Sequence, residues 1–98
     1  MAEYLLAHDL GTSANKAVLY GLDGRLHGSI VSAYPTVYPQ DRWVEQRADD
    51  WWKAVCQSTY LLLEQTGVDA SDIAAVSFSG QMMGCLLVDR DGNPLRNM

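Results

Sequence analysis

AHDLGTSANKAVLY, residues 7–20, places a turn of acidic, glycine, hydroxyl and basic residues between two apolar runs. The apolar runs predict two β-strands joined by that turn. Asp9, at the end of the first run, can hold a hydrated Mg²⁺ ion, and Gly11 lets the backbone come close to a ligand. Thr12 and Ser13 offer hydroxyl and amide donors to phosphate oxygens. The stretch therefore predicts a turn that binds phosphate.

Lys16 adds a positive charge beside this turn, and the alternative role for it is a solvated charge on the strand surface. The turn as a whole also has a simpler interpretation, because Asp, Gly, Thr, Ser and Asn are ordinary turn residues. These residues alone leave two interpretations open, a phosphate site and a hairpin turn that binds nothing.

The composition is typical of one small soluble globular domain: the chain has 98 residues, of which 48% are hydrophobic and 19% are charged. Its formal net charge of −5 argues against unassisted binding to nucleic acid or to an anionic membrane, which needs a basic patch. Small phosphorylated ligands stay compatible with this charge if Mg²⁺ supplies the missing positive charge.

Membrane and secretion signals are missing from the sequence. No stretch approaches the roughly 20 consecutive apolar residues of a membrane span. Residues 1–4 lack the basic start of a secretion signal. We therefore expect a cytoplasmic protein with neither a membrane nor a nucleic acid as its partner.

The cysteines and histidines do not suggest a metal site. Cys56 falls in a predicted helix and Cys85 in a predicted strand, without metal-ligand spacing, so both are expected to be buried thiols rather than a disulfide. His8 and His27 are isolated in the sequence, which predicts no zinc site.

Three antiparallel strands are predicted at the start of the chain, over residues 4–8, 16–22 and 25–34. Asp23-Gly24 supplies the tight turn between the second and the third. Prolines then break the pattern, and the stretch as far as Arg47 is expected to be a loop.

A helix is predicted over residues 48–65, because its apolar residues recur at helical spacing. Gly67 is placed to end it, and Asp49 and Asp50 favour the dipole of its first turn, although Arg47 is a poor N-cap. We expect this helix to pack on the sheet.

Two more strands are predicted in the last third of the chain. Residues 73–79 are rich in β-branched and small apolar residues, which indicates a buried central strand. Residues 84–89 are expected to form another strand, and residues 90–93 a turn. The fold class is therefore α/β, a mixed sheet with an antiparallel three-stranded start and a packed helix.

Five motifs in a fixed order now carry a family resemblance. They are Asp9-Leu10-Gly11-Thr12-Ser13 with Lys16, Trp43-Val44-Glu45-Gln46, Trp51-Trp52, Ser79-Gly80-Gln81-Met82 and Asp91-Gly92-Asn93-Pro94-Leu95. In this order the chain resembles the N-terminal part of the FGGY carbohydrate kinases, and the spacing is most similar to that of xylulose kinases.

The resemblance implies an actin-like, ribonuclease H-like ATPase fold in two domains, with ATP and a sugar meeting in the cleft between them. Residues 1–98 would form part of the N-terminal domain. The implied activity is the ATP-dependent phosphorylation of a sugar hydroxyl, on a pentulose such as xylulose or on a related polyol.

The resemblance also implies roles for the residues of the turn. Asp9 would order Mg²⁺ through a water molecule. Gly11, Thr12 and Ser13 would face the ATP phosphates, and Lys16 would replace the basic residue that the family usually has there.

Gln81, Met82 and Met83 fall where these kinases hold the sugar, at the end of a strand. Met83 departs from the pattern, because xylulose kinases usually have histidine there, and a thioether is only a weak acceptor. This puts the identity of the sugar in doubt. For Met82, gap-filling in the core is the competing interpretation. The tryptophans Trp43, Trp51 and Trp52 are expected to be hydrophobic anchors, and the competing interpretation is that they are platforms for a ligand.

The set of catalytic groups in the chain is incomplete. The family's catalytic aspartate is expected downstream of the chain, and Asp41, Asp49, Asp50 and Asp72 are not credible bases. We therefore expect an inactive fragment of a kinase, whose open sheet edge predicts self-association, for example as a homodimer. The alternative is a stand-alone, non-catalytic module that binds phosphate or a nucleotide.

Overall fold

The N-terminal hairpin forms as its turn chemistry predicts. The computed structural model describes residues 3–98, and in it β1 (Tyr4–Leu10) pairs antiparallel with β2 (Ala14–Gly21), which pairs antiparallel with β3 (Leu26–Ala33). Gly24 takes a positive φ of 86° in the second turn, and its amide donates to the carbonyl of Gly21 at 2.9 Å. The predicted antiparallel start of the sheet is confirmed.

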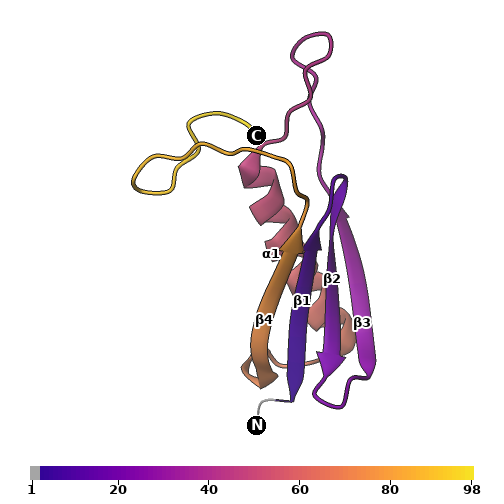
Figure 1. Cartoon of the computed structure of the whole chain (residues 1–98). Coiled ribbons are helices and arrows are strands. Elements are labelled where there is room, and N and C mark those ends of the chain that lie inside the picture. The colour runs from indigo at the N-terminus through magenta and orange to yellow at the C-terminus, as the bar shows by residue number, and fades with distance from the viewer. Residues whose placement is uncertain (1–2) are drawn as a thin grey trace.

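A parallel strand completes the sheet, in the order β3-β2-β1-β4 (Figure 1). β4 (Ile73–Gly80) pairs with β1 from end to end, with one register shift at Ala74. The prediction of a buried central strand here is wrong, because β4 lies at the edge of this sheet and residues 74–80 are exposed. The apolar composition of β4 is therefore not matched by a covering layer among residues 3–98.

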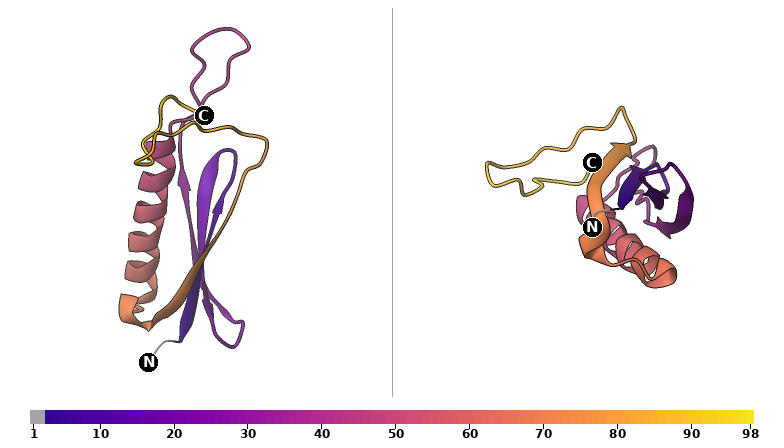
Figure 2. Two further views of the ribbon diagram at one scale, coloured as in Figure 1. Left: turned by 60° about the vertical axis from the view of Figure 1, so that its left-hand side comes forward. Right: turned by 90° about the horizontal axis from the view of Figure 1, so that it is seen from below.

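The helix α1 (Ala48–Thr66) packs against β2 and β3 on one face of the sheet (Figure 2). It begins after Arg47, whose side chain makes no capping hydrogen bond. It ends at Gly67, which has a φ of 74° and donates its amide to the carbonyl of Leu63. A short 3-10 turn, η1 (Ala70–Asp72), leads into β4.

The core lies between this helix and the strands. Leu6, Ala17, Leu19 and Leu62 form its fully or almost fully buried cluster. Gly28 of β3 makes the close approach possible, because an added Cβ there would come within 3.1 Å of Leu62 Cδ1. The predicted packing of the helix on the sheet is therefore confirmed.

Two predictions about the side of α1 that faces β4 are wrong. Cys56 is exposed, and Trp52 is 64% exposed instead of acting as an anchor. Both side chains line an open apolar hollow beside Phe78, where the described residues provide no further layer. Trp43, in the loop, is also 46% exposed, whereas Trp51 is half-buried.

The predicted strand over residues 84–89 does not form. Only Val88 pairs there, in a single bridge with Pro94, because the neighbouring backbone offers no strand for the rest to pair with. Cys85 is accordingly exposed and not buried. The predicted turn at 90–93 is present, held by Asp89, whose amide donates to the carbonyl of Asn93 at 2.9 Å.

Within residues 3–98, neither α1 nor η1 combines the length and the apolar character that crossing a bilayer requires.

A buried polar cluster joins the sheet to the helix. The side-chain nitrogen Nδ2 of Asn15 lies 2.9 Å from His8 Nδ1 and donates to Ser58 Oγ at 2.9 Å. Thr59 Oγ1 lies 3.1 Å from His8 Nε2 and donates to the carbonyl of Val55. These contacts suit a neutral imidazole that accepts at Nδ1 and donates from Nε2. Burial lowers the pKa of His8 below its ordinary value of 6.5.

We expect the free energy of unfolding to fall as the pH drops below 6.5. The unfolded chain binds a proton to His8 at a higher pH than the folded chain does, so the stabilisation is complete above 6.5 and is lost on acidification toward the lowered pKa. Each pH unit in that window removes up to about 1.4 kcal/mol. Urea unfolding at several pH values between 7.5 and 5.5 measures this pH dependence of the free energy of unfolding.

His8→Gln should flatten this pH dependence, while His27→Gln, at an exposed position, should leave it intact. An equal slope in the His8→Gln variant would assign the effect to other groups.

Candidate functional site

The predicted site residues gather at one end of the sheet. β1 and β4 end there, the turn of residues 11–13 lies there, and α1 begins there (Figure 1). The amide of Gln81 donates to the carbonyl of Leu10 at 2.7 Å, which keeps the chain after β4 beside the end of β1. The parallel pairing thus brings the predicted sugar segment next to the predicted phosphate turn.

Asp9, Lys16 and Ser79 lie in one row across β2, β1 and β4. Asp9 pairs in register with Lys16 on one side and with Ser79 on the other. All three are exposed, on the face of the sheet opposite α1. Ser79 Oγ donates to Asp9 Oδ1 at 3.0 Å, which fixes the carboxylate. The role of Ser79 was missed in the sequence, because its link to Asp9 spans 70 residues.

The donor set at Asp9 fits a magnesium ion. Among the described residues, Asp9 Oδ2 has no hydrogen-bond partner, so one oxygen stays open for a hydrated cation. Residues 3–98 contain no cluster of three or more His, Cys, Asp or Glu side chains that could enclose a metal. A single carboxylate combined with water and phosphate oxygens is the way in which proteins usually hold Mg²⁺.

Tyr34, directly after β3, holds the turn of residues 11–13 through hydrogen bonds to its backbone. Its hydroxyl donates to the carbonyl oxygen of Gly11 and lies 3.1 Å from that of Ala14, while its amide donates to the carbonyl of Ser13 at 3.2 Å. Burial, with a smaller contribution from the charge of Asp9, raises the pKa of Tyr34, so the hydroxyl keeps its proton. Sequence reasoning missed this residue.

Tyr34→Phe should loosen the turn. The partly buried carbonyl group of Gly11 would lose its donor, and that of Ala14 would keep only the amide of Gly11, at a cost of about 1 kcal/mol. We expect faster hydrogen exchange at the amide of Gly11, which donates to Ala14, and a lower urea midpoint. Tyr38→Phe, at a side chain that is 71% exposed, is the control and should change neither quantity.

Gln46 packs against the turn of residues 11–13, and its side chain is only 5% exposed. Its Nε2 donates to the carbonyl of Thr12 at 2.7 Å, and its Oε1 accepts from Gln81 Nε2 at 2.8 Å. Its Oε1 also accepts from Trp51 Nε1 at 2.9 Å. One side chain therefore contacts both the predicted phosphate turn and the predicted sugar segment.

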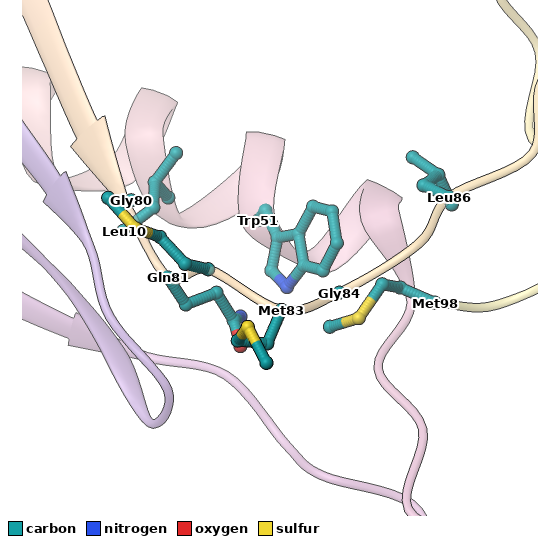
Figure 3. Close-up of a pocket in the computed structure, with 9 residues that line it drawn as sticks. Leu10, Trp51, Gly80, Gln81, Met83, Gly84, Leu86 and Met98 are labelled. Atoms are coloured by element: carbon teal, nitrogen blue, oxygen red, sulfur yellow. The ribbon is translucent and has the colours of Figure 1, made fainter.

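Two cavities meet at Gln81. One of about 330 Å³ is lined by Thr12, Ser13, Gln46 and Gln81, together with loop residues. The other, of about 280 Å³, lies between the start of α1 and the segment after β4 (Figure 3). A ligand that reached from the hydroxyl groups of the turn to this second cavity would pass Gln81.

Met82 and Met83 line the second cavity and lie open to solvent. The core interpretation of Met82 is wrong, because the side chain is 87% exposed. Met83 takes a positive φ of 70°, which is rare for a residue with a side chain. Strained backbone of this kind is concentrated at ligand sites.

Comparison with known proteins places these features in a family. Residues 4–98 match the model of the N-terminal domain of the FGGY family of carbohydrate kinases. A glycerol kinase from Janthinobacterium is 32% identical over 99% of this chain and 20% of its own length. A xylulose kinase from Bacillus subtilis is 35% identical over 97% of this chain and 19% of its own length.

Solved structures agree with the sequence matches. A xylulose kinase from Brucella ovis superposes with a TM-score of 0.90 and 31% identity, over 96% of this chain and 20% of the other. A gluconate kinase from Lactobacillus acidophilus gives a TM-score of 0.88 and 29% identity, over 99% and 19%. The chain spans about a fifth of the length of these relatives. With its mixed sheet and actin-like ATPase fold, the chain belongs to the FGGY family of carbohydrate kinases.

Proposed function

We propose that the protein that carries this chain transfers the γ-phosphoryl group of ATP to a hydroxyl group of a sugar or polyol. The observation that carries the proposal is the cavity of about 330 Å³ that joins the hydroxyl groups of Thr12 and Ser13 to Gln81. It connects a surface suited to phosphate with a surface suited to a polar acceptor, which is the arrangement that phosphoryl transfer needs.

The residues of the turn have separate tasks in this proposal. Thr12 and Ser13 donate hydrogen bonds to phosphate oxygens, and Lys16 adds positive charge. Asp9, fixed by Ser79, binds the water shell of Mg²⁺ through its open oxygen. Bound Mg²⁺ supplies positive charge that the chain, with a net charge of −5, lacks. Tyr34 and Gln46 hold the backbone carbonyls of the turn away from the phosphates.

The acceptor in this proposal is a pentulose such as xylulose, or a related polyol. Gln81, Met82 and Met83 would contact it. Met83 cannot donate a hydrogen bond, so this position discriminates less between acceptors than a hydrogen-bonding residue would. Support for a polyol comes from the glycerol kinases, which are as similar to this chain as the xylulose kinase is.

The test is an ADP-release assay on the natural full-length protein with Mg-ATP and a panel of acceptors that contains xylulose, glycerol and gluconate. Turnover with one or more of them is the expected result. The absence of turnover with every ketose and polyol tried would contradict the proposal. In that case, tight binding of Mg-ATP that Asp9→Ala abolishes would favour a non-catalytic nucleotide-binding module.

A further inference from the structure

Gln46 has one possible orientation of its amide group. The indole of Trp51 can only donate a hydrogen bond, so the atom that it meets at 2.9 Å is Oε1. The carbonyl of Thr12 can only accept, so the atom 2.7 Å from it is Nε2, which also donates to Thr36 Oγ1. Oε1 accepts twice and Nε2 donates twice, which uses the full capacity of this buried amide.

This orientation also determines the orientation of Gln81. Since Oε1 of Gln46 faces Gln81 at 2.8 Å, only the nitrogen of the Gln81 amide can face it. Oε1 of Gln81 is then the free end of the side chain, and it has no hydrogen-bond partner among the described residues. Figure 3 shows Gln81 reaching from the end of β4 into the cavity beside Met83 and Trp51.

We infer that Gln46 is a positioning residue that turns the carbonyl oxygen of Gln81 toward the acceptor substrate. That oxygen accepts a hydrogen bond from a hydroxyl group of the sugar or polyol, so the site favours acceptors that carry a hydroxyl at this place. The inference rests on the proposed kinase function. It goes beyond that function by naming Oε1 as the atom of Gln81 that contacts the acceptor, and Gln46 as the residue that orients it.

Two substitutions at Gln46 separate positioning from general support. Gln46→Glu keeps an oxygen that accepts from Trp51 and Gln81, whereas Gln46→Met removes it. Both variants lose the nitrogen that donates to Thr12 and Thr36, so the KM for ATP should rise to a similar extent in both. In the natural full-length protein we expect the KM for the acceptor to be about tenfold higher in Gln46→Met than in Gln46→Glu. Gln57→Glu and Gln57→Met, at an exposed position of α1, are the matched controls and should change neither KM.

The side-chain resonances give a second readout that does not depend on activity. In NMR spectra of the same variants, the indole N–H of Trp51 and the side-chain amide of Gln81 should keep their hydrogen-bonded shifts in Gln46→Glu. Both should move toward solvent values in Gln46→Met. A purely structural role for Gln46 predicts instead that both variants raise the KM values for the acceptor and for ATP in parallel.

Such a parallel rise, or an unchanged acceptor KM in Gln46→Met, would overturn the inference. If the unmodified protein phosphorylates no acceptor, the proposed function fails and the inferred hydrogen bond to a sugar hydroxyl fails with it. The spectra then still decide the orientation: a Gln81 amide resonance that does not move in Gln46→Met would show that Gln46 does not orient Gln81.

Discussion

Asp9→Asn should lower kcat/KM for phosphoryl transfer by about 10² to 10³, because catalysis of this reaction depends on placing charge around the phosphates. Asparagine has nearly the same shape, and its oxygen still accepts from Ser79. The variant therefore removes the negative charge that we propose holds the hydrated cation, and it leaves the local structure in place. The assay is ADP release at varied Mg²⁺ and ATP concentrations, with an acceptor that turns over in the panel described under Proposed function.

The control for this experiment is Asp41→Asn, which removes the same charge from an exposed loop residue and should leave the rate unchanged. Thermal unfolding of both variants checks that the fold is intact. A kcat/KM for Asp9→Asn within about twofold of the unmodified protein would contradict the assignment of Asp9 to the metal. Loss of a charge that stabilises the transition state should lower kcat/KM by much more.

Leu62→Ala should have the largest effect on stability. Leu62 is fully buried between α1 and the sheet, and Gly28 lets its side chain lie directly against β3. Removing a buried leucine side chain costs about 2 to 5 kcal/mol, which is a large part of the total stability of a small domain. We expect a large fall in the urea midpoint, measured by circular dichroism.

Leu61→Ala is the matched control, because it makes the same chemical change one residue away at a position that is 38% exposed. It should cost under about 1 kcal/mol, because the side chain of Leu61 buries less apolar area than that of Leu62. Equal losses in the two variants would mean that the helix does not present Leu62 to the core in solution.

The sequence was a good guide wherever the deciding interactions are local. The turn at Asp23-Gly24, the helix and its end at Gly67 all depend on backbone preferences of neighbouring residues. The strand predicted over residues 84–89 failed for the opposite reason: its apolar residues need a partner strand, and no pattern within the segment says whether one is present. β4 has the composition of a buried strand, yet burial depends on layers that its own residues do not specify.

The residues of the site also fall into two groups, those that a local motif indicates and those whose role depends on tertiary contacts. Asp9 and the hydroxyl groups of the turn form a contiguous motif, so they could be selected from the sequence before any geometry was known. Tyr34 and Gln46 hold that motif through hydrogen bonds that span 23 and 34 residues. Gln46 belongs to one of the five family motifs, but the sequence does not show what its side chain contacts. Only the tertiary fold reveals that this amide is buried and uses all of its hydrogen bonds.

The pairing of β1 with β4 also has a consequence for the order of folding. The first three strands are joined by short turns, so their contacts close small loops and carry little entropic penalty. The contact of Asp9 with Ser79 closes a loop of 70 residues that contains the helix. Contacts of such high sequence separation form slowly. We therefore expect the antiparallel ribbon to appear early, and the carboxylate of the site to acquire its serine partner only in the final step of folding.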